Sequence, residues 1–152
     1  MTLTATEQEL ETTQQNKNVI KRYVETWNRG DMRGLVQFWS PNIVHHTRAG
    51  SHGYEFTRNI VEEFTKTFPN MRFLIDDMVA EDDRVVTRMT WQANHTLSYM
   101  GSVPDNKEIS CTVIGIARLA DGLIAEHWGV TDELAMMAQL GLLPREYLDA
   151  MA

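Results

Sequence analysis

The hydrophobic spacing of the chain changes at Pro69, and this change constrains the fold more than any other feature of the sequence. Before Pro69, apolar side chains recur every three or four residues, as on the buried face of a helix. After Pro69 they alternate with polar residues, as in a strand that buries one face. Helices followed by consecutive strands predict an α+β fold, with the helices packed on a curved, mainly antiparallel sheet. A sheet that wraps over helices leaves a cavity between the layers, where such folds bind small molecules.

Turn and capping residues predict the boundaries of the elements. The expected N-terminal helices cover residues 16–30, 31–40 and 55–68. The expected strands cover residues 72–80, 84–100, 108–119 and 123–130. A last helix is expected to start at Thr131–Asp132 and to be closed by Gly141. The polar residues 1–15 are expected to be flexible, which leaves a single domain over residues 16–152.

Composition excludes several classes of protein. The net charge of −7 argues against a nucleic-acid partner, whose phosphates would repel the chain. No apolar run approaches the ~18–20 residues of a membrane span, and the first residues lack the basic and apolar parts of a signal peptide. The single cysteine, Cys111, excludes an internal disulfide and suits a reducing compartment. We expect a cytoplasmic protein with no metal site, since zinc-ligand spacing is absent.

The alternation of the last two strands separates the two faces of the sheet. One face carries His127 with small neighbours such as Gly115 and Gly129, which suits the wall of a cavity. The opposite face carries the large apolar side chains Ile114, Ile116, Ile124, Trp128 and Val130. A face of this kind needs cover, so we expect a homodimer formed through the outer face of the sheet.

Three segments of the chain resemble the SnoaL-like polyketide cyclase family. They are Asn-Val-Ile-Lys-Arg-Tyr-Val-Glu-Thr-Trp-Asn-Arg-Gly-Asp at 18–31, Trp-Ser-Pro-Asn-Ile-Val at 39–44, and Arg-Leu-Ala-Asp-Gly-Leu-Ile-Ala-Glu-His-Trp at 118–128. The resemblance covers roughly residues 16–141. It implies the α+β barrel of the nuclear-transport-factor-2-like fold, with three N-terminal helices on the sheet and a C-terminal helix. It says less about the reaction, because one fold hosts many chemistries.

The resemblance also shows where this chain departs from the aldol cyclases of that family. In those cyclases the last strand carries His-x-Asp, and the aspartate deprotonates the polyketide. Here the histidine matches His127, but the aspartate position holds Gly129. Two polar positions that help to bind the substrate match Val113 and Gly115. A glycine cannot accept a proton, so that mechanism is not carried over.

The segment His-Trp-Gly-Val-Thr-Asp at 127–132 resembles instead the AclR-type hydroxylase branch of the family. That resemblance implies oxygenation of an electron-rich aromatic polyketide of the anthracycline type. It implies no bound metal or flavin, dioxygen as a possible co-substrate, and room for a separate reductase that supplies a reduced substrate.

Three residues are candidates for catalysis. His127 faces inward among small neighbours and matches a family histidine, although a core histidine bonded to a backbone carbonyl would fit the same pattern. Asp132 is either a displaced acid or the N-cap of the last helix, and the cap is the preferred interpretation. His95 is either a polar group of the pocket or a surface histidine at a strand end.

The candidates for substrate binding share an expected position on the inner face of the sheet or on the apolar faces of the first helices. They are Tyr23, Trp27, Trp39, His45, Met89, Trp91, Val113, Gly115 and Gly129. The aromatic members could equally be core residues. His45 and His46 are adjacent in an extended segment, so at most one of them faces inward.

The expected function is an enzyme that tailors a flat aromatic polyketide. His127 would deprotonate a phenol or enol to give an electron-rich anion that reacts with dioxygen. An aldol ring closure with a different base is the alternative reaction, and product mass separates the two. A non-catalytic ligand-binding protein of the same fold is the third possibility.

Overall fold

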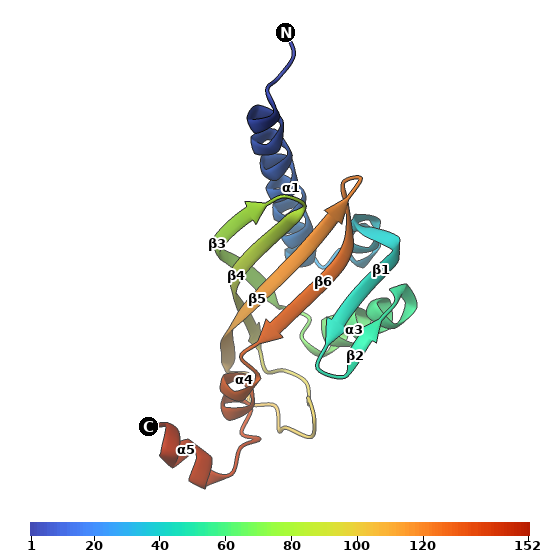
Figure 1. The fold of residues 1–152 in the computed structure, drawn as a ribbon. Helices are drawn as coiled ribbons and strands as arrows, with labels where there is room; N and C mark the ends of the chain where they lie inside the picture. Colours follow the sequence, from blue (N-terminus) through green and yellow to red (C-terminus); the bar gives the residue numbers. More distant parts are fainter.

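The computed structural model describes residues 1–152, apart from the side chain of residue 151, and its elements form two layers. A curved sheet makes one layer, and helices cover one face of it (Figure 1). The strands are β1 (Trp39–Thr47), β2 (Gly50–His52), β3 (Arg72–Glu81), β4 (Arg84–Asn94), β5 (Glu108–Ala120) and β6 (Leu123–Thr131). The helices are α1 (Ala5–Asn28), α2 (Met32–Leu35), the 3-10 turn η1 (Val36–Phe38), α3 (Tyr54–Thr67), α4 (Glu133–Gln139) and α5 (Arg145–Met151). The α+β class predicted from the sequence is confirmed.

The strand order is β2-β1-β6-β5-β4-β3. All neighbouring strands are antiparallel except β1 and β6, which run parallel. Strands β3 to β6 form the predicted meander. The turn between β5 and β6 holds Asp121 and Gly122 at φ values of 51° and 75°, as a type I′ hairpin requires. The parallel pairing of β1 with β6 adds a second part of the sheet, β1 and β2, that alternation alone did not predict.

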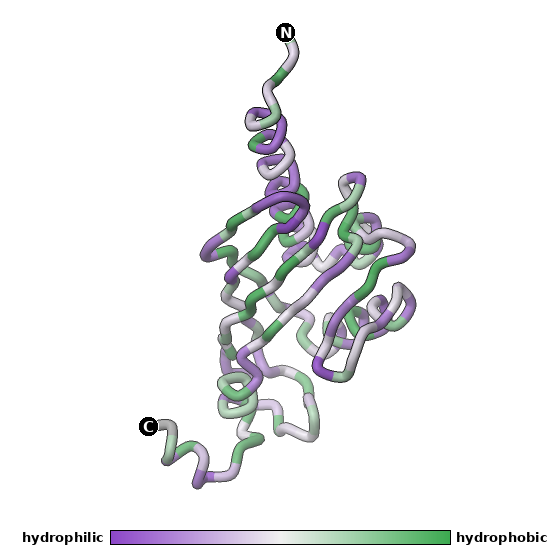
Figure 2. Tube along the Cα trace, viewed as in Figure 1, coloured by the Kyte–Doolittle hydropathy of each residue, from purple (hydrophilic) through white to green (hydrophobic). Residues whose placement is uncertain are grey.

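Several element boundaries differ from the prediction, and the largest differences are at α1 and β4. The expected helix over residues 31–40 was wrong for its last two residues, which belong to β1. Helix α1 begins at Ala5 rather than near residue 16, because Thr4 and Glu7 form a capping box that stabilises its first turn. The N-terminal half of α1 is hydrophilic and extends beyond the sheet (Figures 1 and 2). Strand β4 ends at Asn94 instead of continuing to residue 100, and residues 95–107 form the connection to β5.

The longest helix, α1, has 24 residues but remains too polar to lie in lipid. Among the helices that the structure describes, none is both long enough and apolar enough to cross a membrane.

The core consists of two clusters of buried apolar side chains. One joins α1 to the middle of the sheet and contains Val19, Ile20, Val24, Trp39, Ile43, Val85, Ala117, Leu119 and Ile124. The other joins the end of α3 and α4 to the sheet and contains Phe68, Met71, Trp91, Ala93, Ile109, Cys111, Met136 and Leu140. Burial of these side chains fixes the helical layer on the sheet.

The prediction that Ile124 lies on the outer face was wrong, since its side chain is 1% exposed and belongs to the first cluster. The register explains the difference. Arg118 pairs with Glu126, but the next residue of β5, Leu119, pairs with Ile124, so Ala125 is an extra residue in β6. Such a β-bulge interrupts the alternation of faces, and it brings Ile124 to the same side as His127.

Candidate functional site

A cavity of about 270 Å³ lies between the inner face of the sheet and helices α1 and α3. Its wall is mainly apolar and aromatic. Among the described residues, no aspartate, glutamate, lysine or arginine lines it. Any proton transfer inside this cavity must therefore use imidazole or hydroxyl groups.

The structure brings most of the predicted site residues to this cavity. The residues proposed for substrate binding all line it, together with His127; they are Tyr23, Trp27, Trp39, His45, Met89, Trp91, Val113, Gly115 and Gly129. Their contact with a substrate remains a prediction. The two other catalytic candidates, Asp132 and His95, do not line the cavity.

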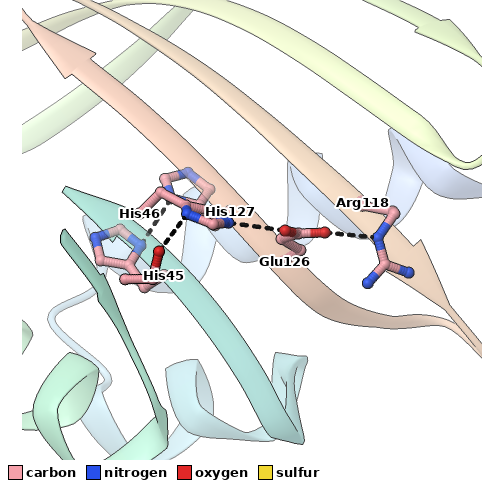
Figure 3. A network of polar contacts seen from close by, with 6 residues as sticks. His45, His46, Arg118, Glu126 and His127 are labelled. Carbon is pink, nitrogen blue, oxygen red and sulfur yellow. Dashed lines mark hydrogen bonds and ion pairs between the residues drawn. The ribbon is translucent and has the colours of Figure 1, made fainter.

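The polar centre of the cavity is a pair of histidines on neighbouring strands. His127 on β6 and His45 on β1 lie directly opposite each other in the parallel pairing. Their rings stack with centroids 5.0 Å apart and planes 12° apart, and the two Nδ1 atoms are 3.0 Å apart (Figure 3). A hydrogen bond between two neutral imidazoles needs one Nδ1–H donor and one Nδ1 lone pair. The two rings are therefore different tautomers, and one of them has its lone pair at Nε2.

Two glycines make room for the ring of His127. A Cβ on Gly129 would lie 3.2 Å from Cε1 of His127, and a Cβ on Gly115 would lie 3.3 Å from its Nε2. Gly115 and Gly129 are direct partners across β5 and β6. The glycine at the position of the cyclase aspartate thus has a structural role here, because the imidazole of His127 occupies the space beside it.

Burial keeps the histidine pair uncharged at neutral pH. Loss of hydration lowers the pKa of His127 from 6.5 to about 3, and the neighbouring His45 and His46 add to the effect. The pKa of His45 is also lowered, first by burial and then by His52 and His46. The partial exposure of His127 is toward the cavity it lines. A neutral imidazole in contact with a ligand cavity can accept a proton.

Four hydroxyl side chains also line the cavity, those of Tyr23, Thr57, Thr87 and Thr131. Thr87 pairs with Gly115 across β4 and β5, and its Oγ1 lies 3.3 Å from the point where Gly115 would carry a Cβ. The space above Gly115 is thus within reach of both Thr87 and Nε2 of His127. Tyr23 accepts a hydrogen bond of 3.0 Å from Trp39 Nε1. Burial raises the pKa of Tyr23, so its hydroxyl keeps a proton to donate.

His46 lies on the other face of the sheet, as expected for the neighbour of an inward histidine. Its Nε2 is 2.7 Å from Glu126 Oε1, and Arg118 binds the other carboxylate oxygen at 3.0 Å (Figure 3). His46 also stacks on Trp128. In the described part of the chain, no group of three or more His, Cys, Asp or Glu side chains is arranged to hold a metal ion.

The structure places His95 outside the cavity. It is 1% exposed and holds the loop over residues 95–107, with Nε2 2.8 Å from Ser102 Oγ and Nδ1 3.3 Å from Asp105 Oδ1. Ser102 is itself 5% exposed, so its hydroxyl is closed to ligands. Neither interpretation made from the sequence included these contacts of His95 within the loop, because the alternation of faces along a strand cannot predict a polar contact formed in a loop.

Asp132 caps helix α4, which is the preferred interpretation made from the sequence. Its Oδ1 accepts a hydrogen bond of 3.0 Å from the backbone N–H of Ala135. The side chain is exposed rather than directed into the cavity. The role of Asp132 as a displaced acid has no support in this geometry.

Some residues at or beside the site were not predicted from the sequence. Thr87 lies two and four residues from Met89 and Trp91 on β4, and so on the same face of the strand. The alternation of faces that selected those two residues could therefore have identified Thr87 as well. His52 could not have been found, because it depends on the pairing of β1 with β2, where it lies opposite His45. Thr131 lines the cavity only because β6 continues past the predicted strand end.

Comparison with known proteins agrees with this architecture. A model of the SnoaL-like polyketide cyclase family matches residues 17–140. AclR from Streptomyces galilaeus, a candidate hydroxylase, is 31% identical, with 87% of this chain and 99% of that chain covered and a TM-score of 0.82. IdmH from Streptomyces antibioticus, a candidate polyketide cyclase, is 27% identical, with 83% and 98% covered and a TM-score of 0.75.

TsrD from Streptomyces laurentii is 29% identical, with 85% of this chain and 96% of that chain covered and a TM-score of 0.74. No match to a curated protein was found. The region matched by the family model runs from α1 to α4 and so contains every residue that lines the cavity.

Proposed function

Because the chain belongs to the SnoaL-like polyketide cyclase family, we propose that this enzyme hydroxylates a flat, electron-rich aromatic polyketide without a bound cofactor. The observation that carries the proposal is the neutral His127, two residues before Gly129, in a cavity that no carboxylate of the described residues lines. The similarity to AclR, a candidate hydroxylase, supports the same reaction class. The apolar and aromatic wall suits a planar ring system.

In the proposed reaction, a phenol or enol of the substrate gives its proton to Nε2 of His127. The pKa of about 3 means that the imidazolium is unstable alone in this cavity. The phenolate formed by the transfer stabilises it, because an opposite charge at short range favours the charged form. Thr87 and Tyr23 are placed to donate hydrogen bonds to substrate oxygens, which also stabilises the anion.

The electron-rich anion then reacts with dioxygen. One oxygen atom enters the substrate, and the other must be reduced to water by two electrons and two protons. A reduced, hydroquinone-type substrate supplies these electrons, which gives a separate reductase a place upstream of this enzyme. The cavity volume of about 270 Å³ lies just below the ~300–1,000 Å³ of typical ligand sites. One end of a tricyclic or tetracyclic substrate therefore enters, and the rest extends to the mouth.

An aldol ring closure is the second candidate reaction, supported by IdmH, which is described as a candidate polyketide cyclase. Since no carboxylate lines the cavity within the described residues, its base would also have to be His127. A protein that only binds a ligand would need no polar pair at the floor of the cavity. The bond of 3.0 Å between His127 and His45 therefore favours an enzyme.

The outer face of the sheet supports a homodimer. Ile114 and Val130 are 46% and 71% exposed and lie opposite each other on β5 and β6. Uncovered neighbouring apolar side chains on a flat sheet face are typical of an interface between copies. The proposed location is the cytoplasm, where the buried Cys111 would remain a free thiol.

The test uses a reduced tricyclic or tetracyclic hydroxyaromatic substrate with ¹⁸O₂. The wild-type product should gain one labelled oxygen atom in its mass spectrum. His127→Gln should lower turnover by roughly 10²–10⁴-fold, the usual contribution of a general base. Asp132→Asn is the control, because asparagine also caps helices. Unchanged turnover in His127→Gln would rule out the proposed base, and a product lighter by one water would identify a cyclase.

A further inference from the structure

Three histidines lie side by side on the cavity face of the sheet, one on each of three adjacent strands. The register pairs His45 on β1 with His127 on β6 and also with His52 on β2. Residues that are direct partners in a sheet project from the same face. We call these three residues the histidine row. It extends from the cavity, which His127 and His45 line, to β2, the edge strand of the sheet.

The ring of His52 connects the interior to the sheet edge. It stacks on Phe56 of α3 with centroids 3.7 Å apart. Its Nε2 is fully enclosed and has no hydrogen-bond partner among the residues that the structure describes, whereas its Nδ1 is not enclosed in this way. Buried polar groups are nearly always paired, so an enclosed, unpaired ring nitrogen calls for an explanation. A nitrogen that must take up and release a proton is left without a permanent partner.

We propose that the histidine row is a proton relay between the cavity and the β2 edge, in which His45 positions His127 and takes over its proton. This inference rests on the proposed role of His127 as the base. Within the described residues, His127 is the hydrogen-bond partner of Nδ1 of the half-buried His45. His45 is thus a positioning residue, and the row gives it a route for the proton that does not pass the bound substrate.

The transfer balances in two steps. The substrate proton binds Nε2 of His127, and the proton on Nδ1 of His127 moves across the 3.0 Å bond to Nδ1 of His45. His45 then releases its Nε2 proton to His52 or to water. The bond between the two rings has now reversed its direction. His127 presents an Nε2–H to the substrate anion and can return a proton later in the reaction.

The row does not store positive charge. Burial and the neighbouring histidines keep the pKa of His127 at about 3 and lower that of His45. The carboxylate nearest in sequence, Glu126, binds His46 on the opposite face of the sheet and not a ring of the row. A proton on one ring of the histidine row raises the free energy needed to protonate a second ring, because like charges repel. The row therefore passes one proton at a time toward the solvent.

The first experiment follows proton transfer with a probe rather than with the natural substrate. 4-Nitrophenol is a flat phenol whose ionisation changes its absorbance, and a laser-induced pH jump on the preformed complex, followed on the microsecond scale, gives the rate at which the bound probe ionises. His45→Phe should slow this rate on the order of tenfold, because His127 loses the hydrogen-bond partner of its Nδ1 and the acceptor of its proton. His52→Gln should slow it in the same direction.

Two further variants separate a relay from simple positioning. His45→Asn keeps an acceptor for the Nδ1–H of His127 but cannot pass a proton on, so it should be as slow as His45→Phe. In His45→Gly, imidazole added to the buffer should restore the rate, while the wild type should not respond to imidazole. Asp132→Asn, which keeps the cap of α4 and does not line the cavity, should leave the rate unchanged. A wild-type rate in His45→Asn would overturn the relay.

A measurement on the ligand-free protein keeps the inference testable if the probe does not enter the cavity. Nitrogen-15 spectra of the imidazole rings should show His127 and His45 as opposite tautomers, with slower exchange of the His127 ring proton in His45→Phe. Identical exchange in the two proteins would contradict the relay. If the probe ionises as expected but polyketides are not hydroxylated, the proposed reaction fails and the relay stands. If His127→Gln ionises the probe like the wild type, the proposed base is wrong.

Discussion

At the scale of single residues, the site depends on the absence of a Cβ atom at Gly115 and Gly129. The ring of His127 lies between them, and either Cβ would come within 3.2–3.3 Å of it. Since the ring is also bonded to His45, it cannot move aside without losing that bond. A side chain at either position of this chain would therefore press on the ring of His127. Glycine at position 129 thus has two effects at once: it supplies no carboxylate base, and it leaves room for the ring of His127.

Gly129→Ser should move the ring of His127. Overpacking of this kind typically costs ~1–3 kcal/mol, so we expect a lower free energy of unfolding and loss of the His127–His45 tautomer pair in nitrogen-15 spectra. Gly53→Ser is the matched control, because a Cβ there meets nothing within 4 Å and serine suits the N-cap of α3. Equal stability of the two variants would show that the His127 ring is not held in place.

The lowered pKa of His127 also predicts how stability depends on pH. Below pH 6.5 the unfolded chain binds a proton at His127, whereas the folded protein does not until about pH 3. Falling pH therefore favours the unfolded state across this window, by up to about 1 kcal/mol per pH unit. Denaturant unfolding between pH 5 and 6.5, above the range of most carboxylates, should show a smaller slope in His127→Gln than in the wild type. Parallel slopes would contradict the shift.

At the scale of elements, the final helix α4 tests whether Asp132 has any role beyond its cap. Asp132→Ala should lower the free energy of unfolding by about 1 kcal/mol, because the first turn of α4 loses a side-chain acceptor. Its turnover at a temperature where it is folded should equal that of the wild type. Thermal unfolding and steady-state rates measured on one preparation separate the two effects. A loss of turnover in the folded variant would return Asp132 to the list of acids.

The elements also show which features the sequence could predict. The meander β3 to β6 follows from alternation and from turn residues such as Asp121 and Gly122, which are local signals. The bulge at Ala125 could not be predicted, because it is defined by the pairing of β6 with β5. For this reason the alternation of residues assigned Ile124 to the wrong face of the sheet. The start of α1 at Ala5 was missed because its first turns bury almost nothing and are stabilised by a cap instead.

At the scale of the whole molecule, only one part of the candidate site could be predicted from the sequence, namely the residues on one face of strands that are neighbours in the chain. The alternation of residues along β5 and β6 correctly predicted that His127, Val113 and Gly115 line the cavity. The partner of His127 was not identified, since His45 reaches it through a parallel pairing across 82 residues of chain. Contacts of this range leave no periodic signal in the sequence. His45 was selected as a binding residue, and its bond to His127 came from the structure.

The outer face of the sheet predicts the state of assembly. Ile114→Glu should shift the protein from dimer to monomer in sedimentation velocity, because a charge would be buried between the copies. Val103→Glu is the control, since Val103 is 80% exposed in the loop after β4 and lies off the sheet face. A wild-type monomer at high protein concentration would refute the dimer. Turnover of the monomeric variant would show whether one copy is sufficient.

The parallel pairing of β1 with β6 has a consequence for the order of folding. Strands β3 to β6 pair with their neighbours in the chain, so that part of the sheet can form from short-range contacts. The pairing of β1 with β6 must instead close a loop of about 80 residues, and contacts of long range form slowly. The meeting of His45 and His127 therefore comes late. A partly folded chain can carry most of its sheet and still lack the pair of His45 and His127.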